Sequence, residues 1–224
     1  MTDEHGAMAP DETPTGLPSA ERLKAFTDAV VAIAMTLLIL PLMESVFDAS
    51  REHLTAGAWV EENVEPLISF ALSFVLIAAF WLSHHRLFSR VHRVSGGLLV
   101  LSVVWMFTIV WLPVATAVVG LLPDSLAQKA IYIGALFLIS MMTSILGWYV
   151  LRHPALHSMP ERSLRGGTLA DAIASALFVV AFLLAAFVPG IGYWAMAVLL
   201  LTGPLQALLA RRLGLRGPGR AVSD

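Results

Sequence analysis

The sequence lacks cysteine and has few charged residues. Of its 224 residues, 13% are Asp, Glu, Lys or Arg, whereas a soluble domain is nearer a quarter charged. Without cysteine there is no disulfide framework and no thiolate metal site. Metal-ligand spacings such as HExxH, P-loops, nucleophile elbows and the potassium-filter motif TVGYG are also missing. We therefore expect no enzymatic activity, no metal or other cofactor, and no nucleic-acid partner.

Long apolar runs make up most of the remaining chain, and 58% of all residues are hydrophobic. A helix that spans the bilayer needs about 20 mostly apolar residues. Runs of that kind occur at 26–47, 64–83, 98–121, 127–151, 169–188 and 191–210. The sequence therefore predicts an all-α polytopic membrane protein with six transmembrane helices joined by short connections.

The basic residues indicate how these spans are oriented. With six spans, 12 of the 14 Lys and Arg residues fall on the side that holds both termini, and only Arg51 and Lys129 fall on the other. Because basic residues concentrate on the cytoplasmic side, both termini are expected there. We divide the chain into a disordered leader at 1–19, a transmembrane domain at 20–212 and a short tail at 213–224.

The first span has two different faces. On an ideal helix with Ile33 at zero, Ala29, Leu37 and Leu40 fall at about −40°, +40° and −20°, which makes one apolar stripe. Asp28 falls near −140° and Thr27 near +120°, behind that stripe. Pro41 is expected to end or kink the helix near the outer surface.

Each face has more than one interpretation. A charged group inside a membrane usually has a partner, and the inner end of the second span offers Trp81, His84, His85 and Arg86. Asp28 could fasten the first span to the second, or it could be a ligand for an ion or a proton. By itself, the stripe is typical of a face that meets lipid or a packed core.

In a separate motif, Thr168 and Asp171 predict a capping box at the start of the fifth span.

A resemblance to a known family adds to this interpretation. The spacing Arg22-x-x-x-Phe26-Thr27-Asp28 resembles the RxxxF[S/T]D signature of the transmembrane protein 175 family of potassium channels, with Thr where many members have Ser. The run "AVVAIAMTLLILPL" continues like the first helix of that family. Further along, "FWLSHHRLF" resembles the end of its second helix and "LPVATAVVG" its third. The resemblance covers roughly residues 20–212.

The resemblance implies a pore lined by the first helix. This chain has one six-helix repeat. The resemblance therefore implies a homotetramer with four copies of the first span around a central axis. Ile33 would form the narrow constriction, with Leu37 and Leu40 one and two turns further out. Ala29 and Thr36 would line the pore, and the Thr36 hydroxyl could assist ion passage or selectivity. An interhelical network would hold the helix in place, formed by Arg22, Phe26, Thr27, Asp28, Trp81 and His85.

The expected function is that of a potassium-permeable cation channel without a pore-loop filter. A ring of isoleucine side chains offers no oxygen to replace the water shell of an ion, and a narrow apolar ring gates by dewetting. Two alternatives stay open at this point, a proton-conducting channel and a secondary cation transporter. The expected partners are potassium ions, the lipid bilayer and further copies of the chain. The composition favours a prokaryotic plasma membrane.

Overall fold

The apolar runs form long helices, as their composition requires. The computed structural model describes residues 19–188, 198 and 201–212. Its helices are α1 (Ala20–Leu37), α2 (Leu40–Arg51), α3 (Ala56–Glu62), α4 (Val64–Phe88), α5 (Gly96–Leu121), α6 (Leu126–Arg152), the short 3₁₀ turn η1 (Pro154–Leu156), α7 (Glu161–Phe187) and α8 (Thr202–Arg212). The described residues contain helices and no β-strand, so the prediction of an all-helical protein is confirmed.

Within the described residues, five helical segments are long and apolar enough to cross a membrane. The first, Ala20–Arg51, combines α1 and α2, and the others are α4, α5, α6 and α7. They match the first five predicted spans. Much of the predicted sixth span at 191–210 lies outside the described residues, as do the leader at 1–18 and the tail at 213–224; α8 begins at Thr202.

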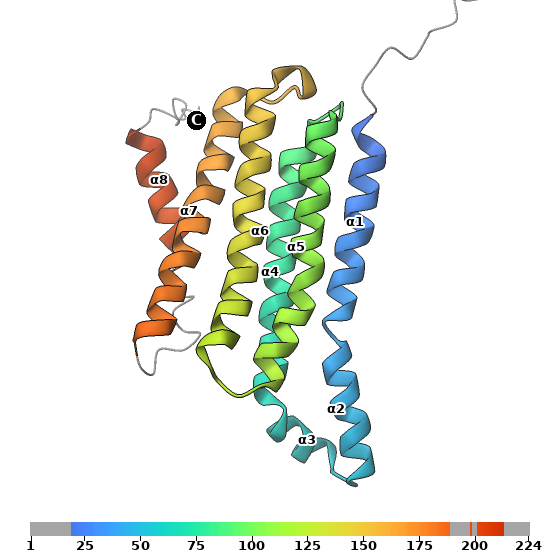
Figure 1. Cartoon of the computed structure of the whole chain (residues 1–224). Helices are drawn as coiled ribbons and strands as arrows, with labels where there is room; N and C mark the ends of the chain where they lie inside the picture. Colours follow the sequence, from blue (N-terminus) through green and yellow to red (C-terminus); the bar gives the residue numbers. More distant parts are fainter. Residues whose placement is uncertain (1–18, 189–197, 199–200, 213–224) are drawn as a thin grey trace, which may run out of the picture.

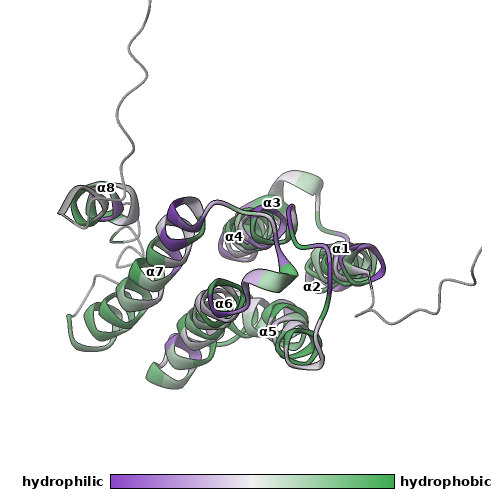
Figure 2. Ribbon diagram, turned by 90° about the horizontal axis from the view of Figure 1, so that it is seen from above, coloured by the Kyte–Doolittle hydropathy of each residue, from purple (hydrophilic) through white to green (hydrophobic). Residues whose placement is uncertain are grey.

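The helices form an elongated bundle in which sequence neighbours are mostly spatial neighbours (Figure 1). α1 packs on α5 and α4, α6 packs on α5 and α7, and α8 packs on α7. Viewed from above, α1 with α2 lies at one edge of the bundle and α8 at the other (Figure 2). The helix expected to line a pore is therefore a peripheral element of the single protomer.

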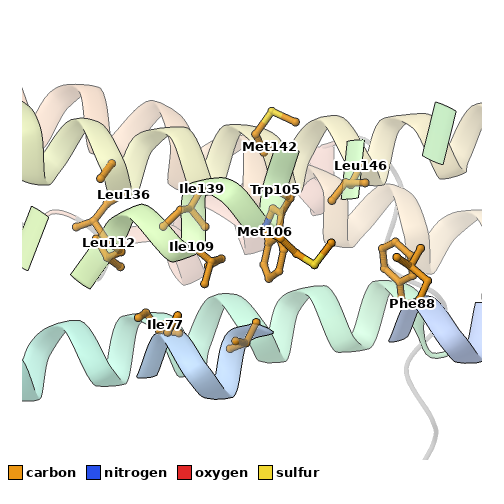
Figure 3. Packing of buried hydrophobic residues seen from close by; sticks show 14 of the residues in the cluster. Ile77, Phe88, Trp105, Met106, Ile109, Leu112, Leu136, Ile139, Met142 and Leu146 are labelled. Atoms are coloured by element: carbon orange, nitrogen blue, oxygen red, sulfur yellow. The ribbon is translucent and has the colours of Figure 1, made fainter. Parts of the chain in front are cut away.

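The centre of the bundle lies between α5 and α6. Trp105, Ile109 and Leu112 of α5 are fully buried, as are Leu136 and Ile139 of α6. Figure 3 shows these side chains pointing into the space between the helices, with Ile77 of α4 on the facing side. In a membrane, such close contact stabilises helices by dispersion and by interhelical hydrogen bonds rather than by the hydrophobic effect.

Polar side chains inside this core are bonded to one another. Trp105 Nε1–H donates to Thr143 Oγ1 at 2.9 Å. Thr116 Oγ1 donates to Ser73 Oγ at 2.8 Å, and Ser73 Oγ lies 2.9 Å from the Tyr132 hydroxyl. These contacts join α4, α5 and α6. A buried hydroxyl without a partner is costly in a low-dielectric interior, which explains why these groups lie opposite one another.

The loops after α4 and α6 fasten the beginning of α1. Ser19 occupies the N-cap position of α1, but its side chain makes no capping hydrogen bond. Instead, the Ala20 amide donates to the His92 carbonyl at 3.1 Å, and the His92 amide donates to the Leu156 carbonyl at 3.0 Å. The loops after α4 and α6 thus brace the start of the first helix.

Two expectations about helix ends had different outcomes. Near Pro41 the first span does break, because α1 ends at Leu37 and α2 starts at Leu40 with Pro41 in its first turn. The capping box at Thr168 and Asp171 is wrong, since α7 begins at Glu161 and both residues lie inside it. Thr168 Oγ1 donates to the Leu164 carbonyl, as hydroxyls inside helices do.

Candidate functional site: the first helix and its inner tie

One face of α1 is packed against the rest of the protomer. Its buried residues are Ala20, Leu23, Thr27, Val31 and Ala34, which recur every three or four positions. That spacing places them on a single helix face, because an α-helix has 3.6 residues per turn. This face meets α5 and α4. The small side chains in the set, Ala20 and Ala34, suit the close approach of membrane helices.

The opposite face of α1 is bare in the protomer. Ile33 is 59% exposed and Leu37 42%, and Ala29 is exposed as well; Leu40, the first residue of α2, is 53% exposed. The stripe predicted from helical spacing therefore lies on the face of α1 that points away from the other helices. Met43 and Phe47 extend this exposed apolar surface along α2. Such a surface requires lipid or another protein chain to cover it.

Thr36 lies on the edge of this stripe, close to where α1 ends. Its hydroxyl donates to the Ile33 carbonyl at 2.7 Å, and the Thr36 carbonyl accepts from the Ile39 amide at 3.3 Å. The Thr36 side chain is exposed in the protomer. With its proton engaged by the backbone, the hydroxyl oxygen presents its lone pairs as an acceptor.

Asp28 is tied to α4. Trp81 Nε1–H donates to Asp28 Oδ1 at 2.7 Å, a short hydrogen bond to a charged acceptor. The ring of Trp81 in turn lies 5.3 Å from that of His85, measured between centroids. Asp28, Trp81 and His85 thus come together in the protomer, and the contact joins the first span to the second.

A polar hollow of about 330 Å³ lies beside this tie. It is lined by Glu21, Lys24 and Asp28 of α1 and by His84 and His85 of α4, among others. Glu21 and Lys24 form an ion pair at 3.0 Å within α1. Charged groups near the start of α1 and the end of α4 therefore share one hollow.

Thr27 and His84 are buried beside the tie. Thr27 Oγ1 and His84 Nε2 have no hydrogen-bond partner within the described part of the chain. The His84 ring stacks on Phe88 and on Trp105, with centroids 4.2 Å apart in each case. His84 therefore belongs to the packed core, whereas its neighbour His85 is exposed.

Arg22 and Phe26 lie on a different side of α1. Both are exposed, and Phe26 is 59% exposed. They line a second hollow of about 600 Å³ together with Ser95 and Leu99 of the chain around the start of α5. Neither residue contacts Asp28 or Trp81 in the described protomer. Within one chain, only part of the expected network comes together.

A second carboxylate inside the bundle was assigned the wrong role from the sequence. Ser83 Oγ donates to Asp171 Oδ1 at 3.0 Å, which joins α4 to α7. The Asp171 carbonyl accepts from Ser175 Oγ at 2.9 Å and from Ser140 Oγ at 3.3 Å. An acidic residue ten positions inside a membrane helix could have indicated a buried interhelical contact. The local Thr-x-x-Asp pattern instead favoured a helix N-terminal capping box.

The side chains of this site can contact an ion, lipid or another chain, but their arrangement does not indicate a catalytic reaction. Across the described ranges, no cluster of three or more His, Asp or Glu side chains is placed to hold a metal ion. What the first helix offers is an apolar stripe, one hydroxyl beside it, and a carboxylate held by an indole.

Comparison with known proteins relates this arrangement to one family. The family described as "Endosomal/lysosomal potassium channel TMEM175" matches residues 22–113, a range that runs from α1 to Pro113 in α5. The similarity in fold extends further. A crystal structure of a lysosomal potassium-selective channel TMEM175 homolog from Chamaesiphon minutus superposes with a TM-score of 0.64, at 23% identity, and covers 85% of this chain and 97% of that one.

Curated relatives carry two kinds of name. The zebrafish (Danio rerio) endosomal/lysosomal proton channel TMEM175 is 22% identical over 158 residues, which is 68% of this chain and 29% of the relative. A potassium channel of Streptomyces collinus is 29% identical over 137 residues, which is 58% of this chain and 64% of the relative. In each case the matched region is less than two thirds of the relative's length.

Proposed function

We propose that the chain is a member of the TMEM175 family, whose model matches residues 22–113, and that it is a potassium-permeable cation channel whose pore is lined by α1. The family is one of ion channels and not of enzymes, and the bacterial relatives are named potassium channels. The proposed assembly is a homotetramer, with four copies of α1 around a central axis and the lipid bilayer around the outer helices.

The bare apolar face of α1 carries this proposal. Ile33, Leu37 and Leu40 point away from the protomer, although α1 itself lies against α4 and α5. If four copies place this face on a common axis, Ile33 forms the constriction, and Leu37 and Leu40 line the next turns outward. Ala29 would line the turn before Ile33, and Thr36 would offer its hydroxyl oxygen beside the constriction.

The constriction would select and gate through hydration. Isoleucine side chains cannot replace the water around an ion, so passage requires either a hydrated opening or partial loss of water. Potassium loses its water more readily than sodium, and a partly dehydrating passage therefore favours potassium. Small radial displacements of α1 would switch the ring between wet and dry states.

Asp28 would support the pore without lining it. Its hydrogen bond to Trp81 fixes the inner half of α1 against α4, on the side of α1 that faces away from the stripe. Thr27 and His85 would complete this support within the protomer. Arg22 and Phe26, which stay exposed in one chain, would complete the network only where a second copy approaches.

Proton conduction is a second candidate function. Several vertebrate relatives are named proton channels, including those of zebrafish and human. Two histidines, His84 and His85, line the same hollow as Asp28 at the end of α4, and imidazole is a side chain that serves in proton relays. The reversal potential under a pH gradient, compared with that under a potassium gradient, separates the two functions.

The proposed location is a prokaryotic plasma membrane, with both termini in the cytoplasm. The start of α1 and the end of α8 lie at the same end of the bundle (Figure 1). Basic residues gather at this end, among them Arg90, Arg93 and Arg152. The positive-inside rule then assigns it to the cytoplasmic side.

The deciding experiment is ion flux through reconstituted Ile33→Asn. An amide at the constriction lowers the barrier to water, so potassium flux should rise and the preference over sodium should fall. The matched control is Ile68→Asn on α4, where the isoleucine is 61% exposed but lies on another helix. Flux that is unchanged in Ile33→Asn, or raised equally in both variants, would contradict a pore on α1. A flux that saturates and requires a counter-ion would instead indicate a transporter.

A further inference from the structure

A polar hollow at the inner end of α4 and α7 contains two opposite charges that the proposed channel does not use. The hollow has a volume of about 270 Å³ and is lined by Ser83 and Arg86 of α4, by Ser163, Thr168 and Asp171 in α7, and by Gln206 of α8. It lies on the side of α4 that faces α7, away from α1. In the protomer, this places it apart from the bare stripe.

The two charges attract each other across the hollow without forming a contact ion pair. Asp171 accepts one side-chain hydrogen bond, from Ser83, and neither Asp171 nor Arg86 takes part in an ion pair among the residues that the structure describes. A charge inside a membrane bundle normally faces a partner or water. A carboxylate and a guanidinium that share one hollow without touching therefore leave room for a ligand between them.

The hollow lies near the end of α4 and in the first turns of α7, the end of the bundle that the proposed orientation assigns to the inner leaflet. Asp171 is ten residues beyond the first residue of α7, which corresponds to about 15 Å along the helix. Ser83 is five residues before the end of α4, about 7.5 Å from it. Leu87, Met159 and Leu164 add apolar walls. If these helix ends lie at the membrane surface, the hollow would extend from the headgroups to the first part of the acyl chains of a lipid.

We propose that this hollow binds a zwitterionic headgroup that carries a primary ammonium and a phosphate, as in phosphatidylethanolamine. The ammonium would donate to Asp171, and the phosphate would lie against Arg86. Arg86 disfavours a simple cation, and Asp171 disfavours an anionic headgroup. A quaternary ammonium has no N–H to donate to Asp171, so phosphatidylcholine would bind more weakly.

The test compares lipids that differ only in methylation of the amine. Purified full-length protein in detergent is mixed with phosphatidylethanolamine, its mono- and dimethylated forms, and phosphatidylcholine with the same acyl chains, and bound lipid is counted by native mass spectrometry. Retention should fall along this series, by roughly tenfold overall, because a hydrogen bond to a charged group is lost. Equal retention of the first and last members would overturn the proposal.

Variants separate the two halves of the headgroup. Asp171→Asn should remove the preference for the primary amine, whereas Arg86→Gln should weaken all members of the series alike and keep the preference. The control Glu161→Gln changes an exposed acid at the start of the same helix and should leave retention unchanged. A preference that persists in Asp171→Asn would contradict the assignment. If that variant does not fold, the methylation series on the unaltered protein still decides.

Soluble phosphoethanolamine distinguishes the source of the headgroup. Displacement of bound lipid by the soluble compound would show that the headgroup alone is recognised. Failure to displace it, with the methylation preference intact, would show that the acyl chains contribute and that the ligand comes from the membrane. None of these measurements involves ion flux, so their outcome is independent of the proposed channel function.

Discussion

The first membrane segment and α6 are both strongly apolar, but the fold uses them differently. In the most apolar window of Ala20–Arg51, 22% of residues are buried, whereas in α6 the share is 56%. α6 contacts α5 on one side and α7 on the other, and α1 offers only one face to its neighbours. Apolarity therefore brings both into the membrane, while the number of neighbouring helices decides how much of each surface stays uncovered in the protomer.

The largest effect is expected where the packed region is broken. Trp105 is fully buried, donates to Thr143 and stacks on His84. Trp105→Ala should destabilise the protein by about 3–5 kcal/mol, as large-to-small changes of buried aromatic residues do. We expect a lower thermal transition and little monodisperse protein by size-exclusion chromatography. Trp111→Ala in the same helix is the control, since Trp111 is half exposed, and an equal loss in both variants would contradict this view of the core.

An intermediate effect is expected where α1 is fastened. Asp28→Ala removes the acceptor of the Trp81 indole, so α1 loses its side-chain hydrogen bond to α4. The yield of assembled oligomer should fall roughly fivefold, the change that about 1 kcal/mol produces. Trp81→Phe removes the donor instead and should have the same effect.

The outcome that would reverse the role of Asp28 is specific. If Asp28→Ala assembles normally but shifts the reversal potential between potassium and sodium, the carboxylate is an ion ligand and not a support. Chromatography of the purified variant and flux from the same preparation answer both questions together.

The smallest effect is expected for a single hydroxyl within the core. Ser73 accepts from Thr116 and lies within hydrogen-bond distance of Tyr132. Ser73→Ala should destabilise the protein by only about 0.6–1 kcal/mol, since polar contacts between membrane helices are individually modest. Denaturant titration in mixed micelles provides the measurement, and Ser69→Ala on the same helix is a control away from this network. A loss as large as that of Trp105→Ala would show that the hydroxyls hold α4, α5 and α6 together.

Several features of the fold were predictable because they depend on local composition. The first five spans follow from apolar runs longer than the bilayer requires, and their predicted centres match the helices. The break near Pro41 follows from a residue that cannot donate a helical hydrogen bond. The stripe of Ile33, Leu37 and Leu40 follows from helical spacing, and all three are exposed in the protomer, the first two on α1 and Leu40 at the start of α2.

Other features depend on which helices meet, and local patterns do not contain that information. The sequence left Asp28 with four candidate partners on α4, and packing selected Trp81. It assigned Asp171 to a cap, because the extra turns at the start of α7, from Glu161 onward, have no apolar signal. It also grouped Arg22 and Phe26 with Asp28, although they lie on the opposite side of α1 in the protomer.

The sequence by itself determined that this is a helical membrane protein whose first helix has one polar and one apolar face, because length, hydropathy and helical spacing are properties of the chain. Only the tertiary structure decided which face is covered. The buried residues Thr27, Val31 and Ala34 are no more apolar than Ile33 and Leu37, but they meet α4 and α5, and the stripe meets nothing in the protomer. Neighbours, and not hydropathy, select the face that is left free.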